Sequence, residues 1–183
     1  PGGNVSIPSQ IDGLPVTTIG DSAFLNRGDI TDIEIPEGIT HILGAAFFGC
    51  RSLTTVRMPK SISHVTGSAF AFCSGLISFL VDPENIAFTN SADGVLFDKG
   101  MTRIVSYPHG KVGSYVIPNG IASIGKCAFS ASRLADVSIP NSITNIEDWA
   151  FDSCNLKSIA LPDSVTHIGR GAFQLTGITN IMI

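Results

Sequence analysis

The sequence carries little charge. Charged residues make up 14% of its 183 positions, well below the quarter that is usual in soluble domains. The net charge of −4 leaves no basic field that could hold nucleic acid or an anionic membrane. No apolar run reaches the ~18 residues of a membrane-spanning helix, so we expect no transmembrane segment. The composition therefore argues against nucleic-acid binding and membrane insertion without naming a partner.

Motifs of catalysis and metal binding are also missing. The chain has no C-x-x-C pair, no G-x-S-x-G turn, no phosphate-binding loop and no H-E-x-x-H helix. Serines are plentiful, but they stand at turns and caps. We therefore expect no enzyme, and no catalytic, cofactor-binding or metal-binding residues.

What the chain does contain is a repeat. Ala-Phe occurs eight times, and in six of these pairs the phenylalanines keep a period of 23 residues in the first half and 22 in the second. They are Phe24, Phe47, Phe70, Phe129, Phe151 and Phe173. A hydrophobic-Pro pair keeps step with them, as in Ile35-Pro36 and Ile117-Pro118. A fixed period of this length indicates one supersecondary unit stacked on copies of itself, which also explains the scarcity of charge.

Each repeat reads as a strand followed by turns. Over residues 55–58 polar and apolar side chains alternate, which is typical of a half-buried strand that Pro59 ends. We expect residues 68–73 to form one helical turn that Ser68 caps. In this turn Ala69 allows close approach and Phe70 fills the interior.

The repeat can be written L-x-x-I-x-I-P-x-S-I-T-x-I-x-x-x-A-F-x-x-C, and it resembles the BspA-like, Treponema-type leucine-rich repeat. The resemblance implies a leucine-rich-repeat solenoid, α/β or β-rich. Its coils would form a right-handed curved superhelix with a parallel sheet on the concave face and short helical turns opposite. Residues 1–183 would make a single solenoid of about seven or eight coils. The asparagine ladder of ordinary leucine-rich repeats is absent; Ser61, Ser142 and Ser164 lie nearest its place, so the backbone groups must be satisfied otherwise.

The period breaks once, because Phe70 and Phe129 are 59 residues apart. Two strand-like segments, 95–97 and 103–107, flank Asp98-Lys99-Gly100, which predicts a hairpin. We interpret residues 84–110, approximately, as a variant insert. It is either a rung that keeps the stack continuous or a bulge that contacts a partner.

The cysteines and histidines fall mostly on repeat positions. Cys50, Cys73 and Cys154 each follow a repeat phenylalanine by three residues, so we expect buried free thiols. A Cys50–Cys73 bridge stays open, because neighbouring strands lie within disulfide range.

Histidine occupies one outward position in three repeats, at His41, His64 and His167. His41 and His64 could share a metal ion. Thr18, Ser123 and Asn145 fill the same position elsewhere, which favours ordinary exposed strand surface. His109 lies outside the repeat register, and we place it in a loop.

Outward strand residues are the candidate partner-binding set. They are Asp32, Glu34, Thr55, Arg57, Ser78, Leu80, Asp136, Ser138 and Ser158. Glu34 and Arg57 stand on adjacent rungs, where they could pair across the ladder. Trp149, the one tryptophan, is either an exposed anchor or bulk that covers a neighbour.

The resemblance also implies a function. BspA-like proteins are associated with adhesion, so the expected role is non-enzymatic binding of a host extracellular-matrix or cell-surface protein, by a secreted or cell-surface protein. A structural spacer that presents another domain is the alternative. The chain opens Pro1-Gly2-Gly3 and stops inside an apolar run at Ile183, so we expect a fragment of a longer chain.

Overall fold

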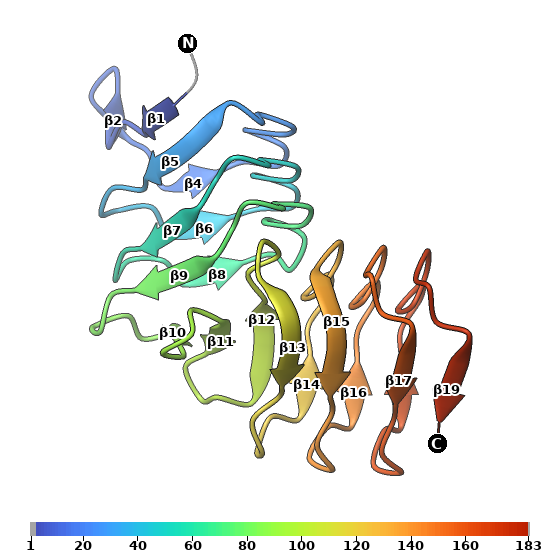
Figure 1. The fold of residues 1–183 in the computed structure, drawn as a ribbon. Helices are drawn as coiled ribbons and strands as arrows, with labels where there is room; N and C mark the ends of the chain where they lie inside the picture. Colours follow the sequence, from blue (N-terminus) through green and yellow to red (C-terminus); the bar gives the residue numbers. More distant parts are fainter. Residues whose placement is uncertain (1–2, 183) are drawn as a thin grey trace.

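The computed structural model describes residues 3–182, and within them the regular structure consists of strands joined by turns (Figure 1). Long strands of successive coils pair in parallel as β1 (Gly3–Ser6), β5 (Ile30–Glu34), β7 (Thr55–Met58) and β9 (Ser78–Val81). Further along the chain they are β13 (Val112–Val116) with β15 (Arg133–Ser138), and β17 (Ser158–Ala160) with β19 (Asn180–Met182). We call these paired strands the long-strand sheets.

Short strands form a second wall of the coils. The first group is β4 (Thr18–Ile19), β6 (His41–Ile42) and β8 (His64–Val65). The second is β10 (Phe88–Asn90), β11 (Leu96–Asp98), β12 (Arg103–Ser106), β14 (Ser123–Ile124), β16 (Asn145–Ile146) and β18 (His167–Ile168). A small hairpin, β2 (Gln10–Ile11) and β3 (Leu14–Pro15), lies outside both walls. The expected stack of parallel coils is thereby confirmed.

The expected helical turns are wrong, since no helix occurs within residues 3–182. The Ala-Phe segments are consecutive tight turns, in which Phe48 N–H donates to the Ala45 carbonyl at 3.0 Å. Phe47 N–H instead donates to Ala69 O of the next coil, at 2.8 Å. Ala45 also has a φ of 53°, in the left-handed region that a right-handed helix cannot include. Bonds between coils thus replace the bonds that would close a helix, and Ser68 caps none.

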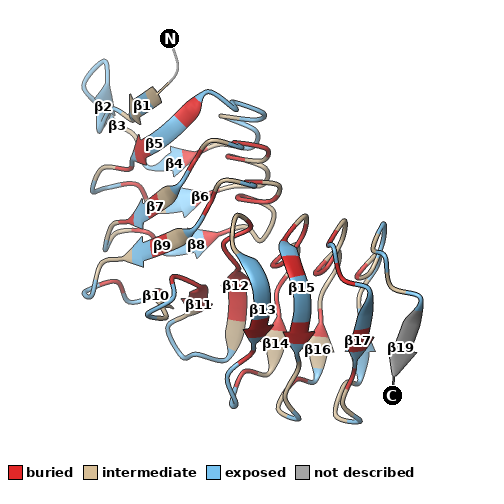
Figure 2. Cartoon of the chain, viewed as in Figure 1, coloured by how far each residue is buried: buried red, intermediate tan, exposed pale blue. Residues whose placement is uncertain are grey.

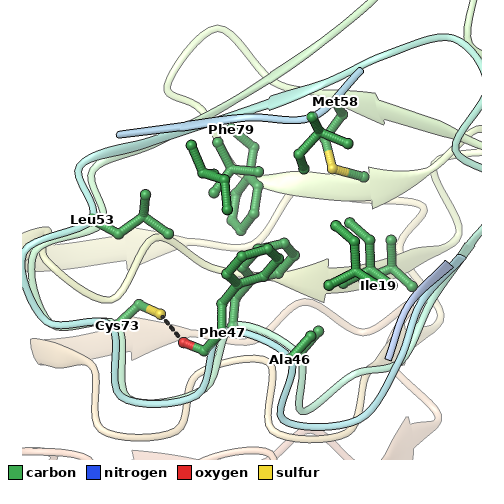
Figure 3. Close-up of a cluster of buried hydrophobic side chains, with 14 of the residues drawn as sticks. Ile19, Ala46, Phe47, Leu53, Met58, Cys73 and Phe79 are labelled. Carbon is green, nitrogen blue, oxygen red and sulfur yellow. Dashed lines mark hydrogen bonds between the residues drawn. The ribbon is translucent and has the colours of Figure 1, made fainter. Parts of the chain in front are cut away.

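Stacked phenylalanines run through the interior of the coils. Phe47 lies 5.2 Å from Phe24 and 5.3 Å from Phe70, ring centre to ring centre, with the rings within 3° of parallel. Figure 3 shows this column beside Leu53 and the strand residues that close the core. A second column contains Phe129, Phe151 and Phe173. The Ala-Phe repeat is therefore the core of the stack.

Tyr107 is the first member of the second column. It stands 22 residues before Phe129, and its ring stacks on Phe129 with a centroid distance of 5.0 Å. Its N–H donates to Ala128 O at 2.8 Å, as the phenylalanines of other coils do to the alanine of the next coil. The 59-residue gap is thus one ordinary spacing of 22 plus one enlarged coil of 37.

The enlarged coil contains the antiparallel strands β10, β11 and β12, and β12 then pairs in parallel with β14. Arg103, at the start of β12, donates through Nε and Nη2 to the two carboxylate oxygens of Glu147, both at 2.7 Å. Burial alone would raise the pKa of Glu147. The hydrogen bonds and positive charge of Arg103, together with hydrogen bonds from the Lys126 N–H and the Ser123 hydroxyl, more than offset this and lower the pKa. The ion pair therefore joins the insert to the second coil beyond it.

Serine hydroxyls and one asparagine take over the role of the missing asparagine ladder. Ser61 Oγ donates to Ile39 O at 2.7 Å, and Ser164 Oγ donates to Ile143 O at 2.8 Å. Asn85, fully buried, donates to Pro59 O and Ile62 O and accepts from two following backbone N–H groups. Carbonyl groups that face the interior between coils are thus satisfied, as buried polar groups must be.

The stack changes direction at the insert. In Figure 1 β5, β7 and β9 run across the view, whereas β13, β15 and β17 run down it. The buried residues accordingly form two clusters, one on each side of the turn. At the junction Gly110 N–H donates to Leu76 O at 2.7 Å, and a Cβ at Gly110 would lie 2.8 Å from the carbonyl carbon of Gly75. Only glycine fits this close approach.

Candidate binding groove

The candidate partner-binding residues all lie on the long-strand sheets, but they do not share one continuous sheet. Asp32, Thr55 and Ser78 are aligned across β5, β7 and β9, and Arg57 is aligned with Leu80. Asp136 and Ser138 lie on β15, which pairs with β13, and Ser158 lies on β17. Figure 2 shows buried residues interspersed with exposed or half-buried ones along these strands. The turn at the insert separates the set into two groups.

Two adjoining hollows mark the first group. One has a volume of about 350 Å³ and the other of about 340 Å³, and both are lined by Ile35 and Arg57. We call them together the N-terminal groove. Its other lining residues are Asn4, Asp32, Ile33, Glu34, Glu37, Met58, Pro59, Leu80, Val81 and Asp82. Four of the candidate residues therefore line the groove: Asp32 and Glu34 line one hollow, Leu80 lines the other, and Arg57 lines both.

The groove is acidic around a single arginine. Asp32, Glu34, Glu37 and Asp82 contribute four carboxylates, and Arg57 contributes one positive charge. Lys60, beside the groove, is paired with Glu84 at 3.2 Å and so adds no net charge. With three net negative charges, the groove complements a partner segment that carries cationic side chains.

The suggested Glu34–Arg57 pair is not formed. The side chain of Glu34 accepts a hydrogen bond from Ser6 on β1, and no ion pair of Arg57 occurs among the described residues. The strand register places the two residues on neighbouring strands, but β1 supplies Glu34 with a closer partner. Arg57 is left exposed between carboxylates and able to bind an outside group.

Apolar side chains complete the surface. Leu80 is 41% exposed in the groove, and Val116 on β13 is 70% exposed beyond the turn. Ser78 is only partly accessible, because Gly94 of the insert lies against it: a Cβ at Gly94 would come within 2.8 Å of Ser78 Cα. Ser78 is therefore a contact between the insert and β9 rather than open binding surface.

The cysteines are structural. All four are free thiols, and Cys50 and Cys73 are not bridged. Cys73 Sγ donates to Phe47 O at 3.1 Å (Figure 3), and Cys154 Sγ donates to Phe129 O at 2.8 Å. Burial raises the pKa of Cys154 to about 11 and raises that of Cys73 as well. Thiolate chemistry is correspondingly unfavourable at these positions.

The structure also places His109, a residue outside the candidate binding set. His109 lies in the turn between β12 and β13, as expected, but it is fully buried there, because it follows Tyr107 into the core of the enlarged coil. The spacing of 22 residues between Tyr107 and Phe129 was the sequence signal that could have predicted this burial.

Trp149 covers a neighbouring residue: its Cδ1 and Nε1 atoms occupy the space that a Cβ at Gly171 would need. Lys126 and Arg170 lie over its ring, at 5.0 and 5.7 Å.

Neither of two other kinds of site is indicated in residues 3–182. No set of three or more His, Cys, Asp or Glu side chains gathers there closely enough to hold a metal ion. That part of the chain also lacks any helix with the length and hydropathy needed to cross a bilayer.

Three solved structures with the same fold come from bacteria. A leucine-rich repeat protein of Eubacterium ventriosum aligns with 98% of this chain at a TM-score of 0.81 and 24% identity, over 53% of its own length. The pneumococcal vaccine antigen PcpA aligns with 97% of this chain at a TM-score of 0.74 and 24% identity, over 50% of its length. A leucine-rich cell surface protein of Faecalibacterium prausnitzii is 29% identical over 97% of this chain and 46% of its own, at a TM-score of 0.54. The chain thus spans about half the length of these relatives.

Comparison with curated proteins finds no match. The family model of the BspA type leucine-rich repeat region matches residues 4–93 and 105–183, in six copies. The gap between the two matches falls within the insert, where the repeat is enlarged by the β10–β11 segment. The chain belongs to the family of BspA-type leucine-rich repeat proteins.

Proposed function

We propose that this chain is a non-enzymatic protein-binding module of a secreted or cell-surface protein, and that it adheres to a host extracellular-matrix or cell-surface protein through the N-terminal groove. The observation that supports this most strongly is the groove itself. Unpaired charges of Asp32 and Arg57 stand beside exposed apolar surface at Leu80, on a sheet that the stacked coils hold in place. Such a mixture suits a polar protein partner.

Family membership supports the same role. Leucine-rich repeat folds are typically protein-interaction modules, and one structural relative is described as a cell surface protein. A spacer that presents another domain is the second candidate. The unpaired Arg57 favours binding, because a spacer has no need of an exposed charged groove.

We expect the chain to capture a matrix or cell-surface protein. The double variant Glu34→Gln with Arg57→Ala should bind this protein about tenfold more weakly, a loss of about 1.4 kcal/mol in binding free energy. Both side chains are exposed, so the melting temperature should hardly change. Glutamine still accepts the hydrogen bond from Ser6. The measurement is surface plasmon resonance against immobilised matrix proteins, with thermal unfolding of each variant.

The matched control exchanges one carboxylate and one arginine elsewhere. Asp21→Asn with Arg51→Ala changes exposed residues of the turns that carry the phenylalanines, and it should leave capture unchanged. A second variant, Asp136→Asn with Arg133→Ala on β15, tests whether the sheet beyond the insert takes part. If the control variant lost as much affinity as the groove variant, only general electrostatic attraction would hold the partner. If the chain captured no protein at all, the spacer role would be favoured.

A further inference from the structure

The second wall of the first coils carries two neighbouring histidines. His41 on β6 and His64 on β8 are directly aligned across the parallel strands, and both are exposed. Their ring centroids are 5.4 Å apart, with the ring planes inclined by 37°. This wall is distinct from the long-strand sheet that carries the N-terminal groove.

The hydrogen bonds of His41 define which ring nitrogen is free. Thr40 Oγ1 lies 3.1 Å from Thr17 O, to which its hydroxyl can donate. Thr40 Oγ1 also lies 2.8 Å from His41 Nδ1, and this hydrogen bond occupies Nδ1 whichever of the two atoms donates. Nε2 makes no hydrogen bond within the described residues. In metal-binding histidines a hydrogen bond at the nitrogen that does not bind the metal orients the ring in the same way.

The separation of the rings suits a shared ion. Two imidazoles bound to one tetrahedral ion, with metal–nitrogen distances of about 2.0–2.1 Å, have centroids about 5.2 Å apart. The observed separation is 5.4 Å, and both side chains have room to turn because they face solvent. Imidazole is a preferred ligand of the late first-row transition ions.

We propose that His41 and His64 form a two-histidine site for a divalent late first-row transition ion, with Zn²⁺ as the representative ion. No third His, Cys, Asp or Glu joins them within the described residues, so water fills the remaining positions. An open site of this kind can accept a donor side chain from another molecule, and the ion would then join the two. Sequence spacing alone favoured ordinary strand surface. The hydrogen bond between His41 and Thr40 and the 5.4 Å separation of the two rings carry the inference beyond it.

The second half of the chain offers an internal comparison. His167 on β18 occupies the equivalent position, but its aligned neighbour is Asn145, and the next is Ser123. A single histidine cannot chelate. His167 should therefore contribute nothing to tight binding, although its sequence context resembles that of His41.

The test is isothermal titration of Zn²⁺, and separately Ni²⁺, into the intact chain and into His64→Asn, His41→Asn and His167→Asn variants. Asparagine is the natural occupant of this position at residue 145, so folding should be retained, which thermal unfolding checks. We expect one site per chain, weakened at least tenfold in either of the first two variants and unchanged in the third. Imidazole proton resonances should shift with Zn²⁺ for His41 and His64 only.

Thr40 supplies a subtler variant. Thr40→Val removes the hydrogen-bond partner of His41 Nδ1 and should weaken Zn²⁺ binding severalfold, whereas Thr40→Ser should restore it. Binding that survives His64→Asn undiminished, or that depends equally on His167, would overturn the proposal. The proposal would also be overturned if the wild-type chain bound Zn²⁺ no more tightly than the His41→Asn variant does. None of these results bears on protein capture by the N-terminal groove.

Discussion

Phe70→Ala is expected to lower the free energy of unfolding by about 3–5 kcal/mol, the range for removal of a buried phenylalanine. Phe70 is 1% exposed and contacts rings on both sides: Phe47 at 5.3 Å and the edge of Phe79 at 5.2 Å. The stacked coils on either side cannot collapse into the cavity without losing their register. Chemical unfolding followed by far-ultraviolet circular dichroism measures the change.

Phe48→Ala is the matched control. Phe48 is next to Phe47 in the chain but lies outside the column, half-buried and in contact with Phe72. Its loss should cost only about 1–2 kcal/mol, because less apolar surface is uncovered. If the two variants unfold alike, the column of rings is not the core of the stack.

Acidification should destabilise the chain through His109. Burial lowers the pKa of His109 to about 4, and its Nδ1 has no hydrogen-bond partner within the described residues. An unfolded histidine has a pKa of about 6.5. Between these values the unfolded state binds a proton that the folded state does not, so stability is complete above about pH 6.5 and falls as the pH approaches 4. The full loss amounts to about 3 kcal/mol.

The experiment compares urea unfolding of the wild type and of His109→Leu between pH 4 and 7.5. Carboxylates titrate in both proteins, so the difference between the two curves isolates His109. We expect that difference to shrink or reverse towards pH 4, since leucine binds no proton, even where the variant is less stable at neutral pH. Two curves that stay parallel throughout would show that His109 is not buried in its neutral form.

Much of the fold follows from the spacing of a few residue types. The Ala-Phe period located the interior side chains, and the alternation before each proline located the long strands. The prediction of helical turns was wrong because non-glycine residues such as Ala45 and Trp149 adopt positive φ. Sequence patterns do not reveal this backbone conformation. Tyr107 was not recognised because it replaces phenylalanine in the enlarged coil, and the burial of His109, two residues further on, was missed with it.

The groove could be predicted only in part. Alternation showed that Asp32 and Arg57 face outward, since every second strand residue does. It could not show that Ser6, from a strand 28 residues away, binds Glu34 and leaves Arg57 unpaired. Nor could it show that Gly94 of the insert lies against Ser78. Contacts of this kind depend on how the coils stack and on the path of the insert.

Amide hydrogen exchange on the chain bound to a captured partner tests the central claim most directly. If the N-terminal groove is the binding surface, exchange should slow in residues 32–40, 57–62 and 80–84, which line the groove or border it. Residues 140–170, beyond the insert, should exchange as in the free chain. Protection confined to those later coils, or to the short-strand wall, would contradict the assignment of binding to the groove.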